Sequence, residues 1–415
     1  MGNLSVKEAQ QRILQQVATK GVENVKLERA LGRVLAEDIR ANRNQPPFDV
    51  SAMDGYALRS ADLARAPAVL TLVEEIKAGD LPKITLQPGQ CARIMTGAPI
   101  PPGADAVIRV EDTRELSDTQ IEIEKAVSAG NDIRPMGEGM RDGQVVLTAG
   151  TEITPGVMGV LATVKCAQMA VYSRPSVAIL ATGDELEGLD EPVDPNKIPN
   201  SNSYALMAQA QALVIEPVLL GIARDDPDEL AEYLCRGLEY DVLLVTGGSS
   251  VGVHDYVRPT LEKLGVAMHF WRVEMRPGHP VAFGTTGRGV IFGLPGNPVS
   301  SMVCFEQLVI PALRRMMGNT KLFRRTVQAR IAQAVKIRPG RTDFIRVRLE
   351  RDPDGGYLAH STGNQSSGAL LSMAQADALL IVSAASTGIT EGEMAVVQLL
   401  DGTTYQDEAG FEERV

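Results

Sequence analysis

The chain has 415 residues, which is too long for one typical domain, so we expect about three or four. Its hydrophobic content of 44% can fill several cores, and its aromatic content of only 4% predicts that aliphatic packing dominates them. A formal net charge of −11 argues against a general nucleic-acid surface or an acidic-membrane surface, so we expect no nucleic-acid and no membrane partner.

Four widely spaced cysteines, Cys91, Cys166, Cys235 and Cys304, form no C-x-x-C pair. This spacing argues against a zinc site or a disulfide scaffold and favours a reducing cytosol. We find no signal-peptide pattern and no apolar stretch long enough to span a membrane. A cytoplasmic protein is therefore expected.

The first part of the chain predicts helices and then strands. Ser5 and Glu8 form a capping-box pattern at the start of an amphipathic helix, and a second short helix is expected over 27–39. Between residues 50 and 142, short apolar runs are separated by Gly and Pro, which is typical of an all-β module. Its strands are expected at 69–73, 90–95, 106–110 and 121–124.

From residue 176 to about 317 strands alternate with helices. Strands are expected at 177–181, 213–220, 242–245 and 290–292, and helices at 203–212, 227–238, 256–264 and 299–317. This alternation predicts a doubly wound parallel sheet with helices on both faces. From residue 326 the pattern is β again: Ile345, Val347 and Leu349 alternate with Arg346 and Arg348, and residues 352–356 form a turn. A small barrel or sandwich is expected there.

The most informative segment follows the apolar strand at 242–245. Thr246 leads into Gly247, Gly248, Ser249, Ser250 and Gly252, and Asp255 stands before a helix. Open α/β sheets bind ligands at the carboxyl ends of their strands, glycines allow close approach to a phosphate, and a nearby carboxylate can hold Mg2+. An ordinary Gly-rich turn is the alternative, and we favour the anion site. The segment is not a P-loop, because Val253 and His254 stand where Lys and Ser/Thr are required.

Three further loops fall at strand ends or helix starts. Asp184 and Glu185 follow a buried strand, residues 200–203 open a helix, and residues 295–298 form a rigid Pro-Gly-Asn-Pro turn. Each has a plain alternative: solvated loop acids, simple helix capping, or a turn without a ligand. Their common location favours a ligand site.

A basic segment lies between these loops. If it is extended, Arg272 and Arg276 share one face, and His279 adds a third group that can carry positive charge. The pattern suggests a phosphate or oxyanion clamp, while a solvated charged strand stays equally open.

Taken together, six motifs resemble the molybdopterin molybdenumtransferases of the MoeA and gephyrin E-domain type, over nearly the whole chain. They are Ser-Ala-Met-Asp-Gly-Tyr-Ala at 51–57, Ile-Met-Thr-Gly-Ala-Pro at 94–99, Thr-Gly-Asp-Glu-Leu at 182–186, Thr-Gly-Gly-Ser-Ser-Val-Gly at 246–252, Arg-Pro-Gly-His-Pro at 276–280 and Leu-Pro-Gly-Asn-Pro-Val-Ser at 294–300.

The resemblance implies a multidomain α/β plus all-β fold with four domains. These are an elongated linking domain of residues 19–44 and 143–172, a β-rich domain of 45–142, an α/β molybdopterin-binding domain of 1–18 and 173–325, and a C-terminal β-barrel of 326–415. It also implies a homodimer whose active site is shared between the α/β domain of one subunit and the β-rich domain of the other.

The implied reaction inserts molybdenum from molybdate into adenylylated molybdopterin, with Mg2+-dependent hydrolysis and release of AMP. Zn2+ is implicated in the family as well, and a transient complex with molybdopterin adenylyltransferase is expected. The alternatives are that the chain is itself the adenylyltransferase, or a molybdopterin-binding scaffold without catalysis.

The resemblance also assigns roles by position. Catalytic roles fall on Asp54, Thr96, Glu185, Asp255, Arg272 and Arg276, of which Asp54 and Thr96 enclose the site of the other subunit. Glu185, Asp225 and Asp255 are the implied metal ligands. The implied substrate-binding residues are Gly183, Asp184, Asn202, Asp225, Thr246, Gly247, Gly248, Ser249, Ser250, Gly252, His279, Pro295, Gly296, Asn297 and Pro298.

The sequence departs from the family pattern at three places, one of which is Ser249 in the Thr-Gly-Gly loop, where a bulkier residue often sits. Relatives commonly have lysine in the cluster that here contains Arg272, Arg276 and His279, and an Asp often follows the Gly-Glu pair where this chain has Gly139. Arginine keeps the positive charge and binds oxyanions well, so we interpret these departures as tuning.

Overall fold

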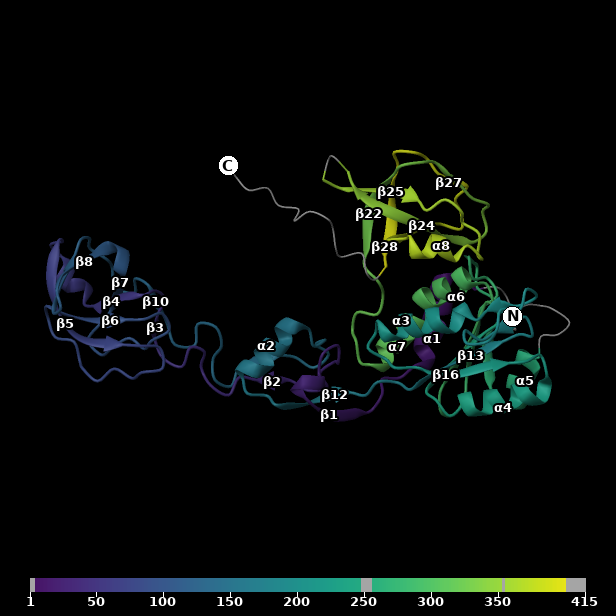
Figure 1. Ribbon diagram of the computed structural model, residues 1–415, viewed down its shortest axis with the longest axis horizontal. Coiled ribbons are helices and arrows are strands. Elements are labelled where there is room, and N and C mark those ends of the chain that lie inside the picture. Colours follow the sequence, from purple (N-terminus) through teal and green to yellow (C-terminus); the bar gives the residue numbers. More distant parts are fainter. Residues whose placement is uncertain (1–3, 248–255, 353–354, 401–415) are drawn as a thin grey trace. The chain divides into compact units, whose positions relative to one another are not determined.

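The computed structural model describes residues 4–247, 256–352 and 355–400 (Figure 1). Its contacts divide the chain into two units. The larger consists of Met1–Val25, Gly32–Ala36 and Ala170–Val415, and the β-rich unit consists of Lys26–Leu31 and Glu37–Met169. The boundaries of the four expected domains, which are finer than this division, stay predictions.

A six-stranded sheet forms the centre of the larger unit, in the order β16-β13-β17-β21-β20-β18. Its strands are β13 (Val177–Thr182), β16 (Val218–Ala223), β17 (Val242–Thr246), β18 (Ala267–Phe270), β20 (Ala282–Thr285) and β21 (Val290–Leu294). The four predicted strands are present and mutually parallel, although β16 begins later than expected, after a turn at Val214 with φ 58°.

Beyond the four predicted parallel strands, the sheet has an antiparallel edge that the sequence pattern did not predict, where β20 runs antiparallel to β18 and to β21. The turn between β20 and β21 is closed by a 2.8 Å hydrogen bond from the Thr286 amide to the Gly289 carbonyl. A turn this short permits only antiparallel pairing, because a parallel crossover needs a dozen or more residues.

Helices cover both faces of the sheet, as predicted (Figure 1). One face carries α1 (Val6–Gln16), α3 (Ser201–Gln211), α6 (Pro298–Cys304) and α7 (Ile310–Met316), and the other carries α4 (Pro227–Gly237) and α5 (Val257–Lys263). The capping box of Ser5 and Glu8 starts α1, and Asp226 caps α4 in front of Pro227. The continuous apolar strands supply the two cores, so the fully buried β13 and β17 pack against helices on both sides.

The path of the chain diverges at β13 and β17. From β13 it passes through α3 to β16 on one side, then returns through α4 to β17 on the other side. A divergence of this kind leaves room for a ligand beyond the carboxyl ends of the two strands.

The C-terminal part is a closed barrel of β22 (Thr326–Ile331), β24 (Thr342–Arg351), β25 (Tyr357–Ser361), β26 (Ala378–Val382) and β28 (Met394–Leu399). It closes because β24 pairs with both β25 and β26. This confirms the predicted barrel and resolves the sandwich alternative. The short strands β23 (Val335–Lys336) and β27 (Gly388–Ile389) pair beside it, and α8 (Leu370–Ala374) follows β25.

Two links attach the barrel to the α/β region. The first is β19 (Met275–Arg276), which pairs in parallel with β24. The second is a π-helical turn, Phe305–Val309, between α6 and α7. Within it Glu306 accepts hydrogen bonds from Arg324 at 2.9 Å and Gln209 at 2.8 Å, and Gln307 donates to Gln398 of β28 at 3.0 Å. Buried side chains that hydrogen-bond across the contact in this way favour one arrangement of the two parts.

The β-rich unit contains a six-stranded sheet in the order β7-β4-β6-β5-β9-β8. Its strands are β4 (Gly55–Leu58), β5 (Ala68–Ile76), β6 (Gln90–Ile94), β7 (Ala106–Arg109), β8 (Thr113–Ser117) and β9 (Gln120–Ile123), which confirms the four strands predicted there. The remaining short elements of the chain are β1 (Val22–Lys26), β2 (Ile39–Arg40), β3 (Val50–Ser51), β10 (Ile133–Arg134), β11 (Val145–Leu147), α2 (Pro155–Thr163), β12 (Gln168–Tyr172), β14 (Leu186–Glu187) and β15 (Ile198–Pro199).

The second predicted helix, over 27–39, is wrong. Only Leu27–Arg29 forms a short 3-10 turn, and Gly32 has a φ of +70°. The backbone of this segment instead bonds to the β12 region: the Ala36 amide donates to the Ala170 carbonyl at 2.9 Å, and the Tyr172 amide donates to the Val34 carbonyl at 3.0 Å. Tertiary pairing therefore overrides the helical spacing of the apolar residues.

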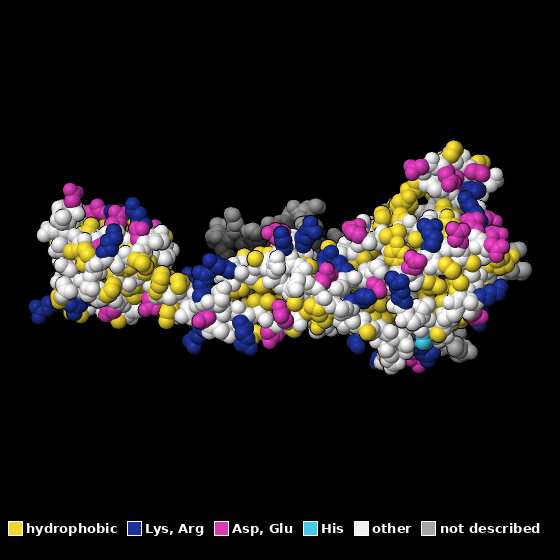
Figure 2. All heavy atoms as spheres, turned by 90° about the horizontal axis from the view of Figure 1, so that it is seen from below, with side chains coloured by type: hydrophobic (Ala, Val, Ile, Leu, Met, Phe, Trp, Pro, Cys, Tyr) yellow, Lys and Arg dark blue, Asp and Glu magenta, His cyan; other side chains and the backbone are white. Residues whose placement is uncertain are grey.

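Figure 2 shows Lys and Arg side chains interspersed with Asp and Glu side chains on the face that it draws. Among the helices of the described residues, none combines the length and the apolar composition needed to cross a membrane.

Replacing Leu244 by Ala should lower the free energy of unfolding by about 2–5 kcal/mol, because Leu244 is completely buried in β17 and its loss leaves a cavity. Val218→Ala is the control: Val218 lies on the edge strand β16 with 43% exposure, so its effect should stay within about 0.5 kcal/mol. Chemical denaturation of both variants measures the difference, and equal effects would contradict the assignment of β17 to the core.

Candidate functional site

The carboxyl ends of β17 and β21 and the start of α3 are held together by one side chain. The Asn202 amide nitrogen donates to the Thr246 hydroxyl at 2.7 Å and to the Gly296 carbonyl at 2.8 Å. The Thr246 hydroxyl in turn donates to the Pro295 carbonyl at 3.3 Å. Four of the predicted site residues therefore form one hydrogen-bonded group at the ligand edge of the sheet.

Two motif glycines shape the loops that follow β13 and β17, and Gly247 lets the end of β17 approach the end of β13. Gly247 has a φ of +96°, and a Cβ at this position would lie 2.3 Å from the Thr182 carbonyl oxygen. Gly183 has a φ of +138°, and its Cβ would meet the Glu185 carboxylate at 2.3 Å. Gly247 is required by both its backbone angle and the fixed Thr182 carbonyl, whereas Gly183 is required by its backbone angle, because the Glu185 side chain could move aside.

The predicted acidic residues gather at the end of β13. Asp184, Glu185 and Asp225 are exposed, and the Asp225 amide donates to the Asp184 carboxylate at 3.2 Å. Exposed carboxylate oxygens are ligands that suit Mg2+. In the part of the chain that the structure describes, no group of three or more His, Cys, Asp or Glu side chains is placed to hold a metal ion. The third expected ligand, Asp255, lies outside the described residues, as do Gly248, Ser249, Ser250 and Gly252.

The Pro-Gly-Asn-Pro turn leads directly into α6. Pro295 is buried, Pro298 begins the helix, and Asn297 at the N-cap position is exposed without a capping bond from its side chain. The Asn297 amide group is therefore not needed for the helix and faces solvent. The next residue, Val299, donates its amide to the Ser367 carbonyl in the barrel region at 3.1 Å.

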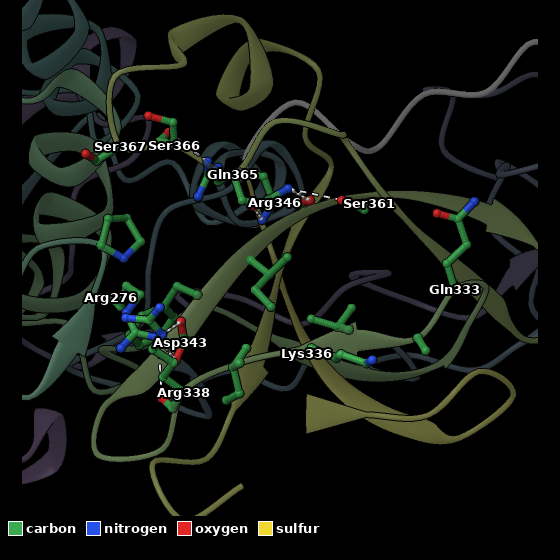
Figure 3. A pocket seen from close by; sticks show the side chains of 16 residues that line it. Arg276, Gln333, Lys336, Arg338, Asp343, Arg346, Ser361, Gln365, Ser366 and Ser367 are labelled. Atoms are coloured by element: carbon green, nitrogen blue, oxygen red, sulfur yellow. Dashed lines mark hydrogen bonds and ion pairs between the residues drawn. The ribbon is translucent and has the colours of Figure 1, made fainter. Parts of the chain in front are cut away.

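A cavity of about 970 Å3 lies where the segment at β19 meets the barrel (Figure 3). In the described part of the chain, its charged lining consists of Arg276, Lys336, Arg338, Arg346 and a single acid, Asp343. The polar side chains that complete it are Gln333, Ser361, Gln365, Ser366 and Ser367. Four cations against one carboxylate give this cavity a positive balance in a chain whose net charge is −11.

Arg346 is the most unusual residue of the cavity, because it is only 1% exposed and no carboxylate pairs with it among the described residues. Its guanidinium donates to the Ser372 hydroxyl at 3.1 Å and to the Ser366 carbonyl at 3.0 Å. Burial lowers the pKa of Arg346 to about 10, so it stays charged at neutral pH. A buried cation without a counter-ion favours the binding of an anion.

The sequence around Arg346 contains no motif that marks it as a site residue. Its alternation with Ile345 and Val347 correctly places it on the outer face of the barrel, since both apolar neighbours lie in the barrel core. The missing information is tertiary: the Ser366 backbone and α8 cover that outer face. A strand pattern alone does not show what packs over it.

The expected clamp of Arg272, Arg276 and His279 is only partly assembled. The segment is extended only at Met275–Arg276, so the two-residue alternation does not apply across it. It folds back through a 3.1 Å bond from the Val273 amide to the His279 carbonyl. Arg276 faces the cavity, whereas Arg272 is exposed and is not part of its lining. The His279 Nδ1 is 2.8 Å from the Val273 carbonyl and donates to it.

In the β-rich unit the two predicted residues Asp54 and Thr96 are in direct contact. The Thr96 amide and hydroxyl donate to one Asp54 carboxylate oxygen at 2.7 Å and 2.8 Å. Both bonds hold the pKa of Asp54 below its ordinary value, and the bond from the Thr96 backbone amide has the larger effect. Gly55 must follow, because a Cβ there would overlap the Ile108 carbonyl. The motif loops at 51–57 and 94–99 thus meet at an exposed Asp54–Thr96 pair in which the carboxylate is ionised.

Three family models match successive parts of the chain. The model described as the MoeA N-terminal region, domains I and II, matches residues 4–164. The model described as a probable molybdopterin binding domain matches residues 178–315, and the model of the MoeA C-terminal region, domain IV, matches residues 328–400.

Curated relatives and solved structures agree with these models. The chain is 39% identical over 388 residues to a molybdopterin molybdenumtransferase of Nostoc sp., covering 91% of this chain and 88% of the relative. It is 34% identical over 410 residues to the Staphylococcus aureus protein of the same name, covering 98% and 97%. A crystal structure of a molybdopterin biosynthesis MoeA protein from Pyrococcus horikoshii aligns with a TM-score of 0.82 at 30% identity, covering 96% of this chain and all of that one.

Replacing Gly247 by Ala should destabilise the strand-end loops by about 1–3 kcal/mol more than the same change at Gly265, because the new Cβ meets the Thr182 carbonyl. Gly265 is the matched control: its φ is +81°, so Ala costs about 1 kcal/mol of backbone strain, but nothing lies within 4 Å of the added carbon. The free energy of unfolding from urea titration measures both, and equal losses would show that the loops relax around the clash.

Proposed function

The chain belongs to the MoeA family of molybdopterin molybdenumtransferases, and from this premise we propose that it inserts molybdenum from molybdate into adenylylated molybdopterin and releases AMP. The protein thus acts in molybdenum cofactor biosynthesis. The observation that carries the proposed chemistry is the uncompensated charge of Arg346 in the basic cavity.

The cavity provides a binding site for molybdate. An oxyanion beside Arg346 would supply the missing negative charge and accept hydrogen bonds from guanidinium groups, which match oxyanions in geometry and charge. Arg276, Lys336 and Arg338 add further positive charge. Since about 970 Å3 is far more than one tetrahedral oxyanion fills, the cavity also has room for part of the organic substrate.

The loops at the strand ends would bind the pterin and adenylyl parts of the substrate. Asn202, Thr246 and Gly296 hold these loops in one conformation, and Asn297 offers an exposed amide group. The two regions adjoin in space, because the Val299 amide of α6 donates to the carbonyl of Ser367 in the cavity wall. A substrate bound across both would bring its dithiolene close to the oxyanion.

Glu185, Asp225 and Asp255 would hold Mg2+ at the strand-end loops. Their oxygen donors fit Mg2+ better than Zn2+, which prefers nitrogen and sulfur ligands in structural sites. When bound, the cation neutralises charge on the substrate phosphates. The side chains of the protein orient the substrate and hold it in one geometry. The contribution of the protein to the reaction is therefore electrostatic and positional.

We further propose a homodimer in which the exposed Asp54–Thr96 pair of one subunit encloses the site of the other. A transient complex with the adenylyltransferase would deliver the adenylylated substrate. We place the protein in the cytoplasm, consistent with its four free cysteines.

The decisive experiment measures AMP release from adenylylated molybdopterin by the purified protein with Mg2+, with and without molybdate. Molybdate-dependent release, with a product that activates an apo molybdoenzyme, is the expected result. ATP consumption in the presence of molybdopterin would instead favour the adenylyltransferase, and tight binding without release would favour a scaffold.

Replacing Arg346 by Met should raise the molybdate concentration for half-maximal AMP release about 10- to 100-fold, because one charged hydrogen-bonding group is worth about 1.5–3 kcal/mol. Arg348→Met is the control, since Arg348 lies on the same strand and is exposed. If both variants behave like the wild type, the oxyanion does not bind at Arg346.

Asp255→Asn should sharply reduce molybdate-dependent AMP release, because one of the three implied metal ligands loses its charge. Raising the Mg2+ concentration should restore part of the rate. Full activity of the variant at low Mg2+ would remove Asp255 from the mechanism.

A further inference from the structure

Among the described residues that line the cavity, Asp343 is the one acid, and its position is determined by a strand pairing. In the parallel pairing of β19 with β24, Arg276 lies opposite Asp343 and Met275 lies opposite Thr342. The Asp343 side chain is only 7% exposed. An acid buried within an anion-binding cavity weakens anion binding by charge repulsion, so its presence needs another reason.

The reason lies in its contact with Arg276. The Arg276 Nη1 donates to the two Asp343 carboxylate oxygens at 3.2 Å and 3.4 Å, and it also lies 3.4 Å from the Arg338 carbonyl (Figure 3). The other donors of Arg276, at Nε and Nη2, make no hydrogen bond to any residue in the described ranges. One corner of the guanidinium is thus anchored, and the opposite edge stays available.

We propose that Asp343 is a positioning residue, which holds Arg276 so that its Nε–Nη2 edge binds the oxyanion. The inference rests on the proposed function of the cavity. It also accounts for arginine at this position: a lysine has all three donors on one nitrogen, so anchoring and ligand binding would compete. The planar guanidinium separates the two tasks.

Burial is the larger influence on Asp343 and raises its pKa, while two cations, Arg276 on β19 and Arg341 just before β24, favour its ionised form. Arg341 is itself paired with Glu274 at 3.3 Å. Lys336, Arg338 and Arg346 line the same cavity. Because the ionised carboxylate anchors Arg276, protonation of Asp343 should release Arg276 as the pH falls through that raised pKa.

The test is equilibrium dialysis of molybdate against the full-length protein and its Asp343→Asn variant. Removal of a negative charge alone would tighten anion binding, whereas loss of the anchor should weaken it. We expect the dissociation constant to rise about 5- to 20-fold, in the range of one lost charged contact. Tighter or unchanged binding would overturn the proposal.

The matched control is Glu274→Gln, which removes the neighbouring ion pair between the residues that directly precede β19 and β24, without changing the Arg276–Asp343 contact. It should leave molybdate affinity unchanged. An equal loss of affinity in both variants would mean that any weakening of the β19–β24 contact is enough, and would overturn a specific role of Asp343.

Two further measurements separate positioning from a structural effect. Wild-type affinity should fall toward acid pH while that of Asp343→Asn stays flat, and Asp343→Glu should recover part of the affinity. Identical pH profiles would contradict the anchor. A wild-type protein that binds no molybdate would overturn the proposed function as well, whereas normal wild-type binding with an unaffected Asp343→Asn variant overturns only the role of Asp343.

Discussion

The hydrogen bonds made by Asn202 are the constraint on which the strand-end site depends. One amide nitrogen bonds to a strand end, through Thr246, and to a rigid turn, through Gly296. This link adds to the bond from the Thr246 hydroxyl to the Pro295 carbonyl, which already joins the ends of β17 and β21, and it ties both to the start of α3. With it, the sheet fixes their separation, and a rigid parallel sheet is a precise support for groups that must recognise one substrate.

The cavity depends on a different constraint, the attachment of the barrel. The π-helical turn places Glu306 and Gln307 where a regular helix would not, and both side chains bond to residues that belong to or lead into the barrel. The β19–β24 pairing attaches the other side. Arg276 from the α/β region and Arg346 from the barrel therefore line the same cavity, although they are 70 positions apart in the sequence. Extra turns of π-helix are often found near functional sites, and here the turn positions a wall rather than a ligand group.

Much of this organisation could be predicted from sequence. Continuous apolar runs indicated β13 and β17, the spacing of glycines indicated the loops that follow them, and the motifs indicated the family. Three features could not be read in this way. The antiparallel edge depends on a short turn with no strong signal, the segment at 27–39 exchanges helical bonds for pairing with β12, and the burial of Arg346 depends on a loop and a helix that pack over its strand. Each is decided by contacts between residues distant in the sequence, which local patterns do not contain.

The charge distribution has a kinetic consequence. A chain of net charge −11 repels dianions over most approaches, whereas the cavity, with four cations and one acid, attracts them. Such a contrast concentrates the electric field at the mouth of the cavity and guides small oxyanions there faster than undirected diffusion. The field, however, acts equally on sulfate, phosphate and molybdate. Discrimination among the abundant competitors in a cell must therefore come after arrival, from the fixed positions of individual N–H donors, and dwell time rather than encounter rate decides which oxyanion is used.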